Sequence, residues 1–421
     1  MTNNRFKQYA KGIAGRARQA SFEMANLSAK AKNKILFQVA GALRREKAFL
    51  LKENSRDVFA GRKAGLSSSL LDRLTLNEKR IEDMAASLEA VAKLRDPAGE
   101  VIERWKRPNG LRISKVRVPL GVILIIYEAR PNVTQECAGL CIKSGNSVIL
   151  RGGREAFYSN KAIANLFRKV LRSNRVSPDG VILVERLDYE IVDELLKRQE
   201  EVNLAIPRGG EALIRRVVAT ARIPVIKHYK GVCHVYVDRS ADMRMATEIA
   251  FNAKCQRPSV CNSMETLLVH RGIAKKFLPL LVRELKSVKC EIRGCAETCR
   301  IIPEAKKATE RDWYEEYLDY ILAVRVVRSV DEAARHIRKY GSAHTDAIVT
   351  RTPKNAERFV QLVDSSSVMV NTTTRFSDGF QYGFGAEIGI STDKIHARGP
   401  MGLEGLTSYK YVVEGNGQLR Q

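Results

Sequence analysis

The feature that most constrains the fold is a repeat of short apolar runs, turns and amphipathic stretches in the middle of the chain. Apolar runs occupy residues 118–126, 147–150, 181–184 and 203–206, and amphipathic stretches follow at 159–172, at 189–198 and after Gly210. Short strands that alternate with helices are typical of βαβ units, in which crossover helices join parallel strands. The sequence therefore predicts an α/β fold with a doubly wound, Rossmann-type sheet.

The regions on either side of this repeat predict further helices, a hairpin and a second α/β unit. The first 95 residues have the spacing of successive amphipathic helices, with a break at Gly61 and Gly65. Residues 101–118 alternate around the pair Asn109-Gly110, which favours a hairpin turn. A second α/β unit is expected from about residue 232 to about residue 370. Because 421 residues are many for one core, we expect two or three domains.

The net charge of +25 allows two classes of function. A strong positive field attracts polyanions, so a basic nucleic-acid-binding protein is one hypothesis. The basic residues are, however, spread along the chain among Asp and Glu, without a basic motif interleaved with aromatic residues. This distribution favours an enzyme with a solvated basic surface and anionic ligands.

Several features concern the compartment and metals. The sequence contains no uninterrupted run of about 18 apolar residues, so no membrane span is predicted. The first 20 residues are basic and acid-free, as in a transit peptide, but their apolar spacing continues to Leu43, which favours a folded helix.

The eight cysteines of this large chain are expected to be free thiols, so we predict a cytoplasmic protein. Cys290, Cys295 and Cys299 lack CxxC spacing and a neighbouring histidine pair, so no metal site is predicted.

Two segments carry groups suited to acyl transfer. Cys261 lies on a polar turn after Arg257-Pro258 and before an apolar run. A thiol beside an arginine is typical of a thiolate nucleophile, although a lone cysteine is also commonly a small buried residue. Asn132 lies at a strand-to-helix turn, where its amide can point at a ligand. A nucleophilic thiol and an amide donor are the minimum that acyl transfer through an oxyanion requires.

These segments are part of a longer series of motifs. In chain order the motifs are VPLGV to YEARPNV, VILRGG, IPRGG, GVCHVYVD, QRPSVCN to ETLLV, DSSSVMVN, TRFSDG, GAEIGIST and HARGPMGLEGLTSYK. From about residue 10 to about residue 412 the series resembles the gamma-glutamyl phosphate reductases, a family within the aldehyde dehydrogenase superfamily. The resemblance implies a cofactor-binding domain at 1–230, with the hairpin 98–118 as an oligomerisation arm. It also implies a catalytic domain at 231–370 and a return segment at 371–421 that completes the active site and the arm.

The resemblance also implies a reaction. The chain is expected to reduce L-glutamyl 5-phosphate to L-glutamate 5-semialdehyde and phosphate with NADPH, the second step of proline biosynthesis. Cys261 would carry a thioester, while Asn132 and the main-chain amide of Cys261 stabilise the oxyanion. The implied partners are a separate glutamate 5-kinase and further copies of this chain, in a homo-oligomer. The alternative is another NADP-linked aldehyde or acyl-phosphate dehydrogenase.

The resemblance further implies a cofactor site. Its residues are Arg151, Gly152, Gly153 and Arg154 at the adenosine ribose, Gly209 and Gly210 at the pyrophosphate, and Glu387 at the nicotinamide ribose. Neither glycine turn is a GxGxxG motif, but glycine at a helix start exposes main-chain amides to phosphate. Arg154 favours NADPH over NADH, because arginine suits a ribose 2′-phosphate. A structural role for Glu387 is the alternative.

Four arginines are candidates for binding the anionic substrate: Arg130, Arg257, Arg375 and Arg398. The rival thiol Cys255 is expected to pack in the core. Hydrolytic members of the superfamily carry a glutamate base in the segment that corresponds to residues 226–231. This chain has no carboxylate there. The absence agrees with acyl-phosphate chemistry, because phosphate release needs no activated water.

Overall fold

The computed structural model describes residues 2–420, which fold as two compact units. Unit 1 comprises the chain up to Lys227, Gly383–Gly389 and the chain from Met401 onward. Unit 2 comprises His228–Tyr382 and Ile390–Pro400. The first boundary lies between Lys227 and His228, where the sequence analysis placed it after residue 230. The chain returns to unit 1 in two separate stretches.

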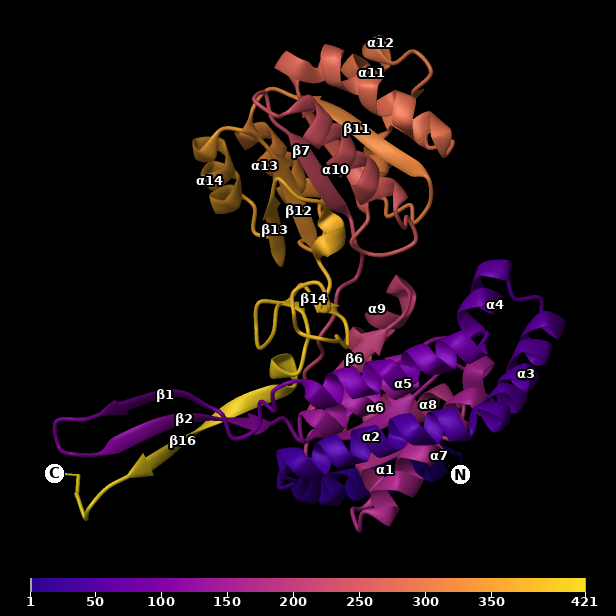
Figure 1. The fold of residues 1–421 in the computed structure, drawn as a ribbon, viewed down its shortest axis with the longest axis vertical. Coiled ribbons are helices and arrows are strands. Elements are labelled where there is room, and N and C mark those ends of the chain that lie inside the picture. The colour runs from indigo at the N-terminus through magenta and orange to yellow at the C-terminus, as the bar shows by residue number, and fades with distance from the viewer. Residues whose placement is uncertain (1, 421) are drawn as a thin grey trace. The chain divides into compact units, whose positions relative to one another are not determined.

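Unit 1 begins with helices that the N-terminal periodicity predicted (Figure 1). They are α1 (Thr2–Ala25), α2 (Ala29–Arg45), α3 (Lys47–Lys63), α4 (Ser68–Leu74) and α5 (Glu78–Lys93). Later helices of the unit are α6 (Pro131–Lys143), α7 (Phe157–Ser173), α8 (Tyr189–Leu195) and α9 (Glu211–Thr220), with the short 3-10 turns η1 (Arg154–Ala156), η2 (Pro178–Gly180) and η5 (Glu404–Leu406). Among residues 2–420 no helix is both long and apolar enough to cross a membrane.

The central sheet of unit 1 is parallel, as the alternating pattern predicted. Its strands β3 (Val122–Tyr127), β4 (Ser147–Arg151), β5 (Val181–Leu183) and β6 (Leu204–Arg208) are arranged in the order β5-β4-β3-β6. One face of β3, with Val122, Leu124 and Ile126, forms a buried cluster with α1 and α8. Tyr127 lies on the other face, where its hydroxyl bonds to Thr134 of α6. Helices therefore cover both faces.

The strand order creates a switch point at the carboxyl end of the sheet. The chain runs from β3 outward through β4 to β5, and then adds β6 on the other side of β3. Ligands of open α/β sheets bind in the crevice where the order reverses. In unit 1 this crevice lies between the turns that follow Tyr127 and Arg208.

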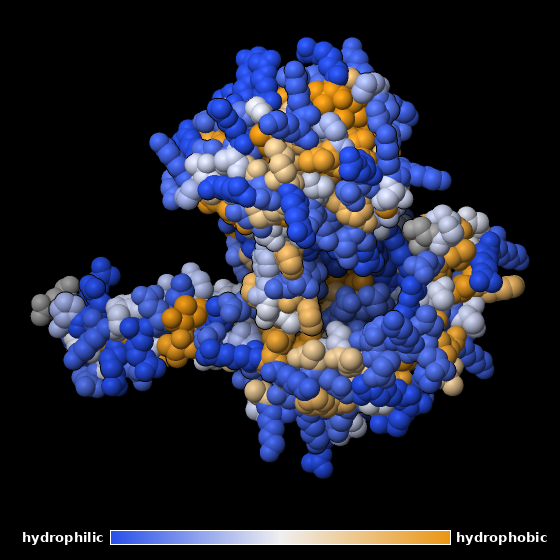
Figure 2. Space-filling view, turned by 45° about the horizontal axis from the view of Figure 1, so that its top comes forward, coloured by the Kyte–Doolittle hydropathy of each residue, from blue (hydrophilic) through white to orange (hydrophobic). Residues whose placement is uncertain are grey.

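Unit 1 also contains a separate three-stranded antiparallel sheet. It has the order β1-β2-β16, from β1 (Val101–Lys106), β2 (Arg112–Pro119) and β16 (Thr407–Glu414). Gly110 has a φ of 89°, which the left-handed turn between β1 and β2 requires and which glycine adopts without strain. The predicted hairpin is therefore present, and the last strand of the chain extends it. One hydrophobic patch lies on the otherwise mostly hydrophilic surface of this sheet (Figure 2).

Unit 2 is built on a seven-stranded parallel sheet with the order β10-β9-β11-β8-β7-β12-β13. Its strands are β7 (Cys233–Val237), β8 (Met264–His270), β9 (Glu291–Gly294), β10 (Lys306–Lys307), β11 (Ile321–Val327), β12 (Thr345–Val349) and β13 (Ser367–Val370). Its helices are α10 (Met243–Cys255), α11 (Arg271–Ser287), α12 (Ala296–Ile301), α13 (Val330–Tyr340) and α14 (Pro353–Leu362), with the turns η3 (Glu310–Tyr314) and η4 (Thr374–Phe376) and the short strands β14 (Ile390–Ser391) and β15 (Gly399–Pro400).

Helices cover both faces of this second sheet too. Val235 and Val237 of β7 face a core cluster with α10 and α11. Tyr236, between them, faces a second cluster with α13 and α14. Because successive residues of a strand point to opposite faces, a continuous apolar run is what a sheet buried on both sides requires.

Candidate active site

Cys261 lies on the turn between α10 and β8, at the amino end of the sheet of unit 2. The main-chain N–H of Ser263 donates to the carbonyl of Val260 at 3.0 Å, which closes the turn. The side-chain amide of Asn262 donates to the carbonyl of Ser377 at 2.9 Å, and the Thr374 hydroxyl donates to the carbonyl of Asn262 at 2.7 Å. The segment around η4 therefore holds the cysteine turn in place, and the thiol is half-buried.

Gly231 packs directly against this turn. A Cβ at position 231 would lie 1.9 Å from the carbonyl oxygen of Cys261, so only glycine fits there. Residues 226–231 are the segment in which the sequence analysis found no carboxylate. The structure adds one from elsewhere, because the main-chain N–H of Gly231 donates to Oε1 of Glu316 at 2.8 Å. Sequence reasoning missed Glu316, since nothing in its local pattern links it to the cysteine.

A second thiol and two histidines also lie near Cys261. Cys233 Sγ donates to the carbonyl of Cys261 at 3.2 Å. Burial raises the pKa of Cys233 well above the ordinary thiol value, which makes it a poor nucleophile. The ligating atoms of His228, Cys261 and His344 all lie within 4.8 Å of one another.

Two of the four candidate arginines belong to the surroundings of the thiol. Arg375 Nε donates to Oε1 of Gln256 at 2.9 Å. Burial and the neighbouring charge of Arg257 lower the pKa of Arg375, while Cys261 acts in the opposite direction. Arg375 therefore contributes positive potential at Cys261, and positive potential favours a thiolate. Arg257 lies near Arg375.

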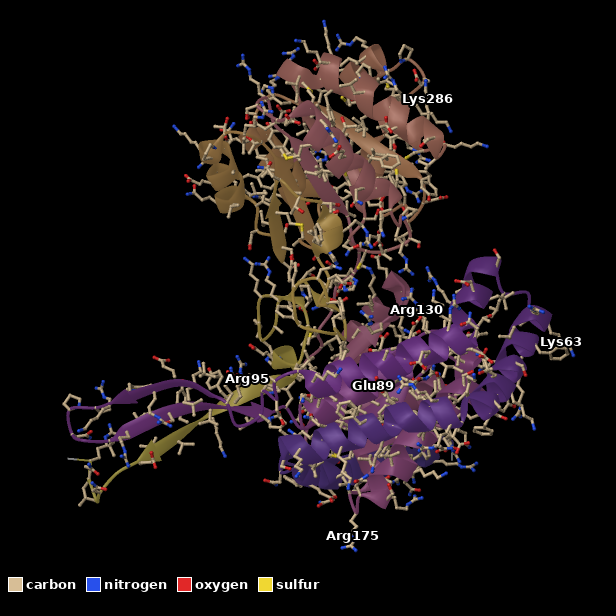
Figure 3. All side chains as sticks on the ribbon, in the orientation of Figure 1. Lys63, Glu89, Arg95, Arg130, Arg175 and Lys286 are labelled. Atoms are coloured by element: carbon tan, nitrogen blue, oxygen red, sulfur yellow. The ribbon has the colours of Figure 1, made fainter. Side chains whose placement is uncertain are left out.

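The other two arginines have different surroundings. Arg398 of unit 2 is paired with Asp364, with Nη1 at 2.7 Å from Oδ1 and Nη2 donating to the main-chain carbonyl at 2.7 Å. Arg130 is exposed at the start of α6 in unit 1 and is labelled in Figure 3. Substrate binding by each of the four arginines stays a prediction.

Cys255, the rival thiol, lies in the apolar core between α10, α11 and the sheet, where it is 8% exposed. Its neighbour Lys254 forms a fully buried ion pair with Glu265, with Nζ 2.6 Å from Oε2. Burial raises the pKa of Glu265 to about 7 against the opposing charge of Lys254. These surroundings agree with the packing role predicted for Cys255.

Asn132 lies in the first turn of α6, at the switch point of unit 1. Its side-chain amide donates to Oε1 of Glu136 at 2.9 Å. Burial raises the pKa of Glu136, and the charges of Arg208 and Arg130 partly oppose the shift. The amide is therefore held by the helix that carries it. Its role toward an oxyanion stays a prediction.

The predicted pyrophosphate turn lies at the same switch point. Gly210 is the N-cap of α9, and its N–H donates to Oε1 of Glu128 at 3.2 Å. A Cβ on Gly209 would lie 2.6 Å from Cδ of Glu128. Glycine is therefore needed for the close approach of this turn to Glu128. The N-terminus of α9 offers main-chain amides suited to a phosphate group.

The second glycine turn follows β4. A Cβ on Gly152 would lie 2.1 Å from Nδ2 of Asn160, and one on Gly153 would lie 2.4 Å from Oε2 of Glu155. Arg151 is 5% exposed, and its guanidinium donates to the carbonyls of Gly152 and Leu187, each at 2.9 Å. Burial lowers its pKa. Arg151 therefore stabilises the turn, whereas Arg154 is exposed on η1.

Glu387 belongs to the first return stretch, Gly383–Gly389, which is part of unit 1. A Cβ on Gly389 would lie 2.5 Å from Nη1 of Arg208, the last residue of β6. The return stretch therefore passes the carboxyl end of the sheet, at the switch point. Glu387 itself is half-buried, and its contact with a ribose stays a prediction.

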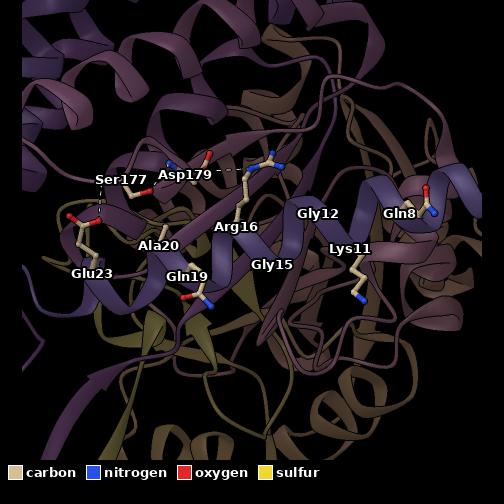
Figure 4. A pocket seen from close by; sticks show the side chains of 10 residues that line it. All are labelled: Gln8, Lys11, Gly12, Gly15, Arg16, Gln19, Ala20, Glu23, Ser177 and Asp179. Carbon is tan, nitrogen blue, oxygen red and sulfur yellow. Dashed lines mark hydrogen bonds and ion pairs between the residues drawn. The ribbon is translucent and has the colours of Figure 1, made fainter.

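A cavity of about 710 Å³ in unit 1 lies away from this crevice, along α1 (Figure 4). Arg16 pairs with Asp179 at 3.4 Å, and Glu23 accepts from the main-chain N–H of Ser177 at 2.9 Å. These residues precede β5, so the cavity lies at the amino end of the sheet. It holds none of the predicted site residues.

The positive charge is distributed over many elements. Lys63 on α3, Arg95 before β1, Arg175 after α7 and Lys286 on α11 are labelled in Figure 3. Many cations are paired with carboxylates, for example Arg44 with Glu82 and Glu89. This distribution agrees with a solvated basic surface rather than one basic face for nucleic acid.

The chain is similar to known proteins over nearly its whole length. It matches the aldehyde dehydrogenase family over residues 6–319. It is 52% identical to the gamma-glutamyl phosphate reductase of Thermodesulfovibrio yellowstonii over 99% of each chain.

The chain is also similar to solved structures. The crystal structure of gamma-glutamyl phosphate reductase from Thermotoga maritima is 47% identical, covers 98% of this chain and 100% of its own, and superposes with a TM-score of 0.96. A glyceraldehyde-3-phosphate dehydrogenase from Methanocaldococcus jannaschii, complexed with NADP, shares the fold with a TM-score of 0.67 at 16% identity, over 97% of this chain and 95% of its own.

Proposed function

The chain belongs to the aldehyde dehydrogenase family, and we propose that it reduces L-glutamyl 5-phosphate to L-glutamate 5-semialdehyde with release of phosphate. In this role it performs the second step of proline biosynthesis. The observation that supports the substrate most directly is the similarity to the Thermotoga maritima reductase over nearly the whole of both chains. The motifs around Cys261 and Asn132 lie within that similarity.

The first chemical step belongs to Cys261. Its thiolate attacks the acyl carbon, and a C–S bond forms as the bond to phosphate breaks, which leaves a thioester. The positive potential of Arg375 favours the thiolate. We assign oxyanion stabilisation to the side-chain amide of Asn132 and the main-chain amide of Cys261.

The second step needs a nicotinamide cofactor, as is general in this family. When bound, the cofactor supplies the hydride that reduces the thioester to a thiohemiacetal. The thiohemiacetal then collapses to the aldehyde and releases the Cys261 thiolate. The switch point of unit 1 suits such a group, because α9 directs its N-terminal amides there, beside the carboxylate of Glu128 that packs on Gly209.

We propose NADPH as the preferred cofactor. The support is Arg154, whose exposed guanidinium follows β4 on a turn shaped by Gly152 and Gly153. A guanidinium can bind a ribose 2′-phosphate through paired hydrogen bonds. Glu387 is proposed to bind the nicotinamide ribose.

We further propose that the protein acts in the cytoplasm as a homo-oligomer, supplied by a separate glutamate 5-kinase. All eight cysteines are free thiols, which supports a reducing compartment. An acyl phosphate is labile, so a kinase must form the substrate where this enzyme consumes it.

The reaction class is tested in the oxidative direction. With NADP and the semialdehyde, the wild-type protein is expected to reduce one NADP per site and then stall until phosphate is added. Phosphate is needed as acceptor, because residues 226–231 provide no carboxylate to activate water. Steady, phosphate-independent formation of glutamate would instead make the chain a hydrolytic aldehyde dehydrogenase.

Glu316 provides the matched control for that experiment. Its carboxylate accepts the N–H of Gly231 and is the acid that the structure adds to this segment. If hydrolysis occurs and Glu316→Gln stops it, Glu316 is the base and the proposal for phosphate chemistry fails. If the wild type is phosphate-dependent, Glu316→Gln should leave that dependence unchanged.

A further inference from the structure

We propose that His228, Cys261 and His344 form an inhibitory site for a thiophilic divalent cation, with Zn²⁺ as the expected ion. Within residues 2–420 these side chains are the one group whose ligating atoms lie close enough, within 4.8 Å of one another, to hold a metal. Thiolate sulfur and imidazole nitrogen are the ligand types that Zn²⁺ binds most often in proteins. The three residues are far apart in the sequence, which is why the sequence analysis predicted no metal site.

His344 is the strongest sign of a ligand. The residue is completely buried, and its Nε2 has no hydrogen-bond partner. Its Nδ1 lies 2.9 Å from the Thr345 hydroxyl. A buried nitrogen without a partner is costly, and a bound cation would satisfy it. Burial also lowers the pKa of His344 to about 3, so the imidazole is neutral, as a metal ligand must be.

His228 is oriented as a metal ligand. Its Nδ1 lies 2.8 Å from the carbonyl of Ile390 and donates to it, which leaves Nε2 as the unprotonated nitrogen. Metal-bound histidines usually donate their other ring N–H to a carbonyl or carboxylate in this way. The rings of His228 and His344 meet edge to face, with centroids 5.4 Å apart.

The geometry requires only a small adjustment. Tetrahedral zinc has bonds of about 2.3 Å to sulfur and about 2.0 Å to nitrogen, so its ligand atoms are roughly 3.3–3.6 Å apart. The Cys261 side chain, half-buried on a turn, can approach by rotation about χ1. Three protein ligands leave the fourth position to water. The thiol loses its proton to solvent on binding, so zinc affinity rises with pH.

Such a site would regulate the enzyme directly. A sulfur bound to zinc cannot attack an acyl carbon, so bound metal blocks thioester formation, and a chelator restores it. This inhibition rests on the proposed function, whereas metal binding does not.

Direct binding is measured first, without substrate. The reduced full-length protein in phosphate-free buffer is titrated with Co²⁺ as a spectroscopic substitute and then with Zn²⁺ in competition. We expect one Co²⁺ per chain, with the visible bands of tetrahedral cobalt and a thiolate charge-transfer band. The charge-transfer band should be absent in Cys261→Ala. A spectrum without that band in the wild type would overturn the proposal.

Asparagine variants remove one ligand at a time. In His228→Asn the amide nitrogen takes the place of Nδ1, so the bond to the Ile390 carbonyl is retained, and His344→Asn similarly retains its bond to Thr345. Loss of a hydrogen bond that supports a metal ligand typically lowers metal affinity ~10–100-fold. Each asparagine variant removes a ligand itself, so each should lower the zinc affinity by more than that factor. If His344→Asn fails to fold, His228→Asn alone decides the matter. Wild-type zinc affinity in His228→Asn would overturn the proposal.

Two control variants should bind zinc as the wild type does. His270→Asn changes a histidine at the opposite end of β8 and retains an N-cap acceptor for the N–H of Gly272. Cys299→Ser removes a thiol of α12. Loss of cobalt binding in Cys299→Ser would place the metal elsewhere and overturn the proposal.

The two hypotheses fail separately. If the wild type binds cobalt through Cys261 but has no reductase activity, only the proposed function fails. If it is active and binds no metal at Cys261, only the metal site fails.

Discussion

At the scale of single residues, Cys255 and Cys261 differ in how deeply they are buried. Cys255 is enclosed by the apolar core of unit 2, whereas Cys261 lies half-buried on a turn with Arg375 near it. We expect Cys261→Ala to abolish turnover and Cys255→Ala to retain most of it, because in the proposed mechanism only Cys261 carries the thioester. Steady-state rates and mass spectrometry of the trapped acyl-enzyme measure this. Equal loss in both variants would contradict the assignment.

The burial of His344 leads to a prediction about how the free energy of unfolding depends on pH. Burial lowers the pKa of this residue to about 3 in the folded protein, whereas the pKa of a histidine in the unfolded chain is about 6.5. Between these values the unfolded state binds one more proton, so the free energy of unfolding falls as the pH falls. The slope from this group is about 1.4 kcal/mol per pH unit.

The matched variant isolates that slope. His228 and Cys233 also lie against His344, so the total slope is not assigned to one residue. Urea unfolding at several pH values below about 6.5 should give a slope in His344→Asn that is smaller by about 1.4 kcal/mol per pH unit. An unchanged slope would mean that His344 is protonated in the folded protein.

At the scale of elements, Gly231 controls how the strand β7 approaches the cysteine turn. A side chain there would overlap the carbonyl oxygen of Cys261, which lies 1.9 Å from the Cβ position. Gly231→Ala must therefore displace the turn, and we expect a loss of kcat on the order of 10²-fold, the scale of a 1 Å misplacement. Steady-state kinetics and circular dichroism together distinguish displacement from unfolding.

Gly15 is the control for Gly231. It lies inside α1, and nothing lies within 4 Å of its Cβ position. Gly15→Ala should leave kcat unchanged and stabilise the protein by up to about 1 kcal/mol, because alanine is the better helix former. Wild-type kcat in Gly231→Ala would show that the cysteine turn tolerates displacement.

The turn after β4 makes a prediction about cofactor choice. Arg154→Glu replaces an exposed cation with an anion that repels a ribose 2′-phosphate, so the ratio of kcat/KM for NADPH to that for NADH should fall. Arg175→Glu is the control, since it makes the same charge change on the loop after α7. If both variants shift the ratio equally, the overall field and not Arg154 is responsible.

At the scale of the whole molecule, we expect the three-stranded sheet to mediate the proposed self-association. Tyr411 and Val413 of β16 are 56% and 55% exposed, beside other exposed apolar residues of the sheet. Apolar patches of this kind mark interfaces. We expect Tyr411→Glu with Val413→Glu to lower the mass measured by sedimentation velocity. Phe59→Glu, which changes a 73% exposed residue of α3, should leave the mass unchanged.

The fold class and the strands of unit 1 were predictable because their signal is local. The runs at 147–150, 181–184 and 203–206 became β4, β5 and β6 within a few residues, since hydrophobic period and glycine turns act over short distances. The Asn109-Gly110 hairpin was predictable for the same reason. The order of the motifs identified the family, which the comparisons confirm.

The surroundings of the thiol were decided only by tertiary structure. Glu316 reaches Gly231, and His344 approaches Cys261, across large separations in the chain. The two returns of the C-terminal segment to unit 1, which bring Gly389 against Arg208, likewise depend on packing. A sequence read alone shows which groups can do chemistry, because residue type is local. It does not show which of these groups lie in contact, because contacts between distant residues depend on the order of the strands in each sheet.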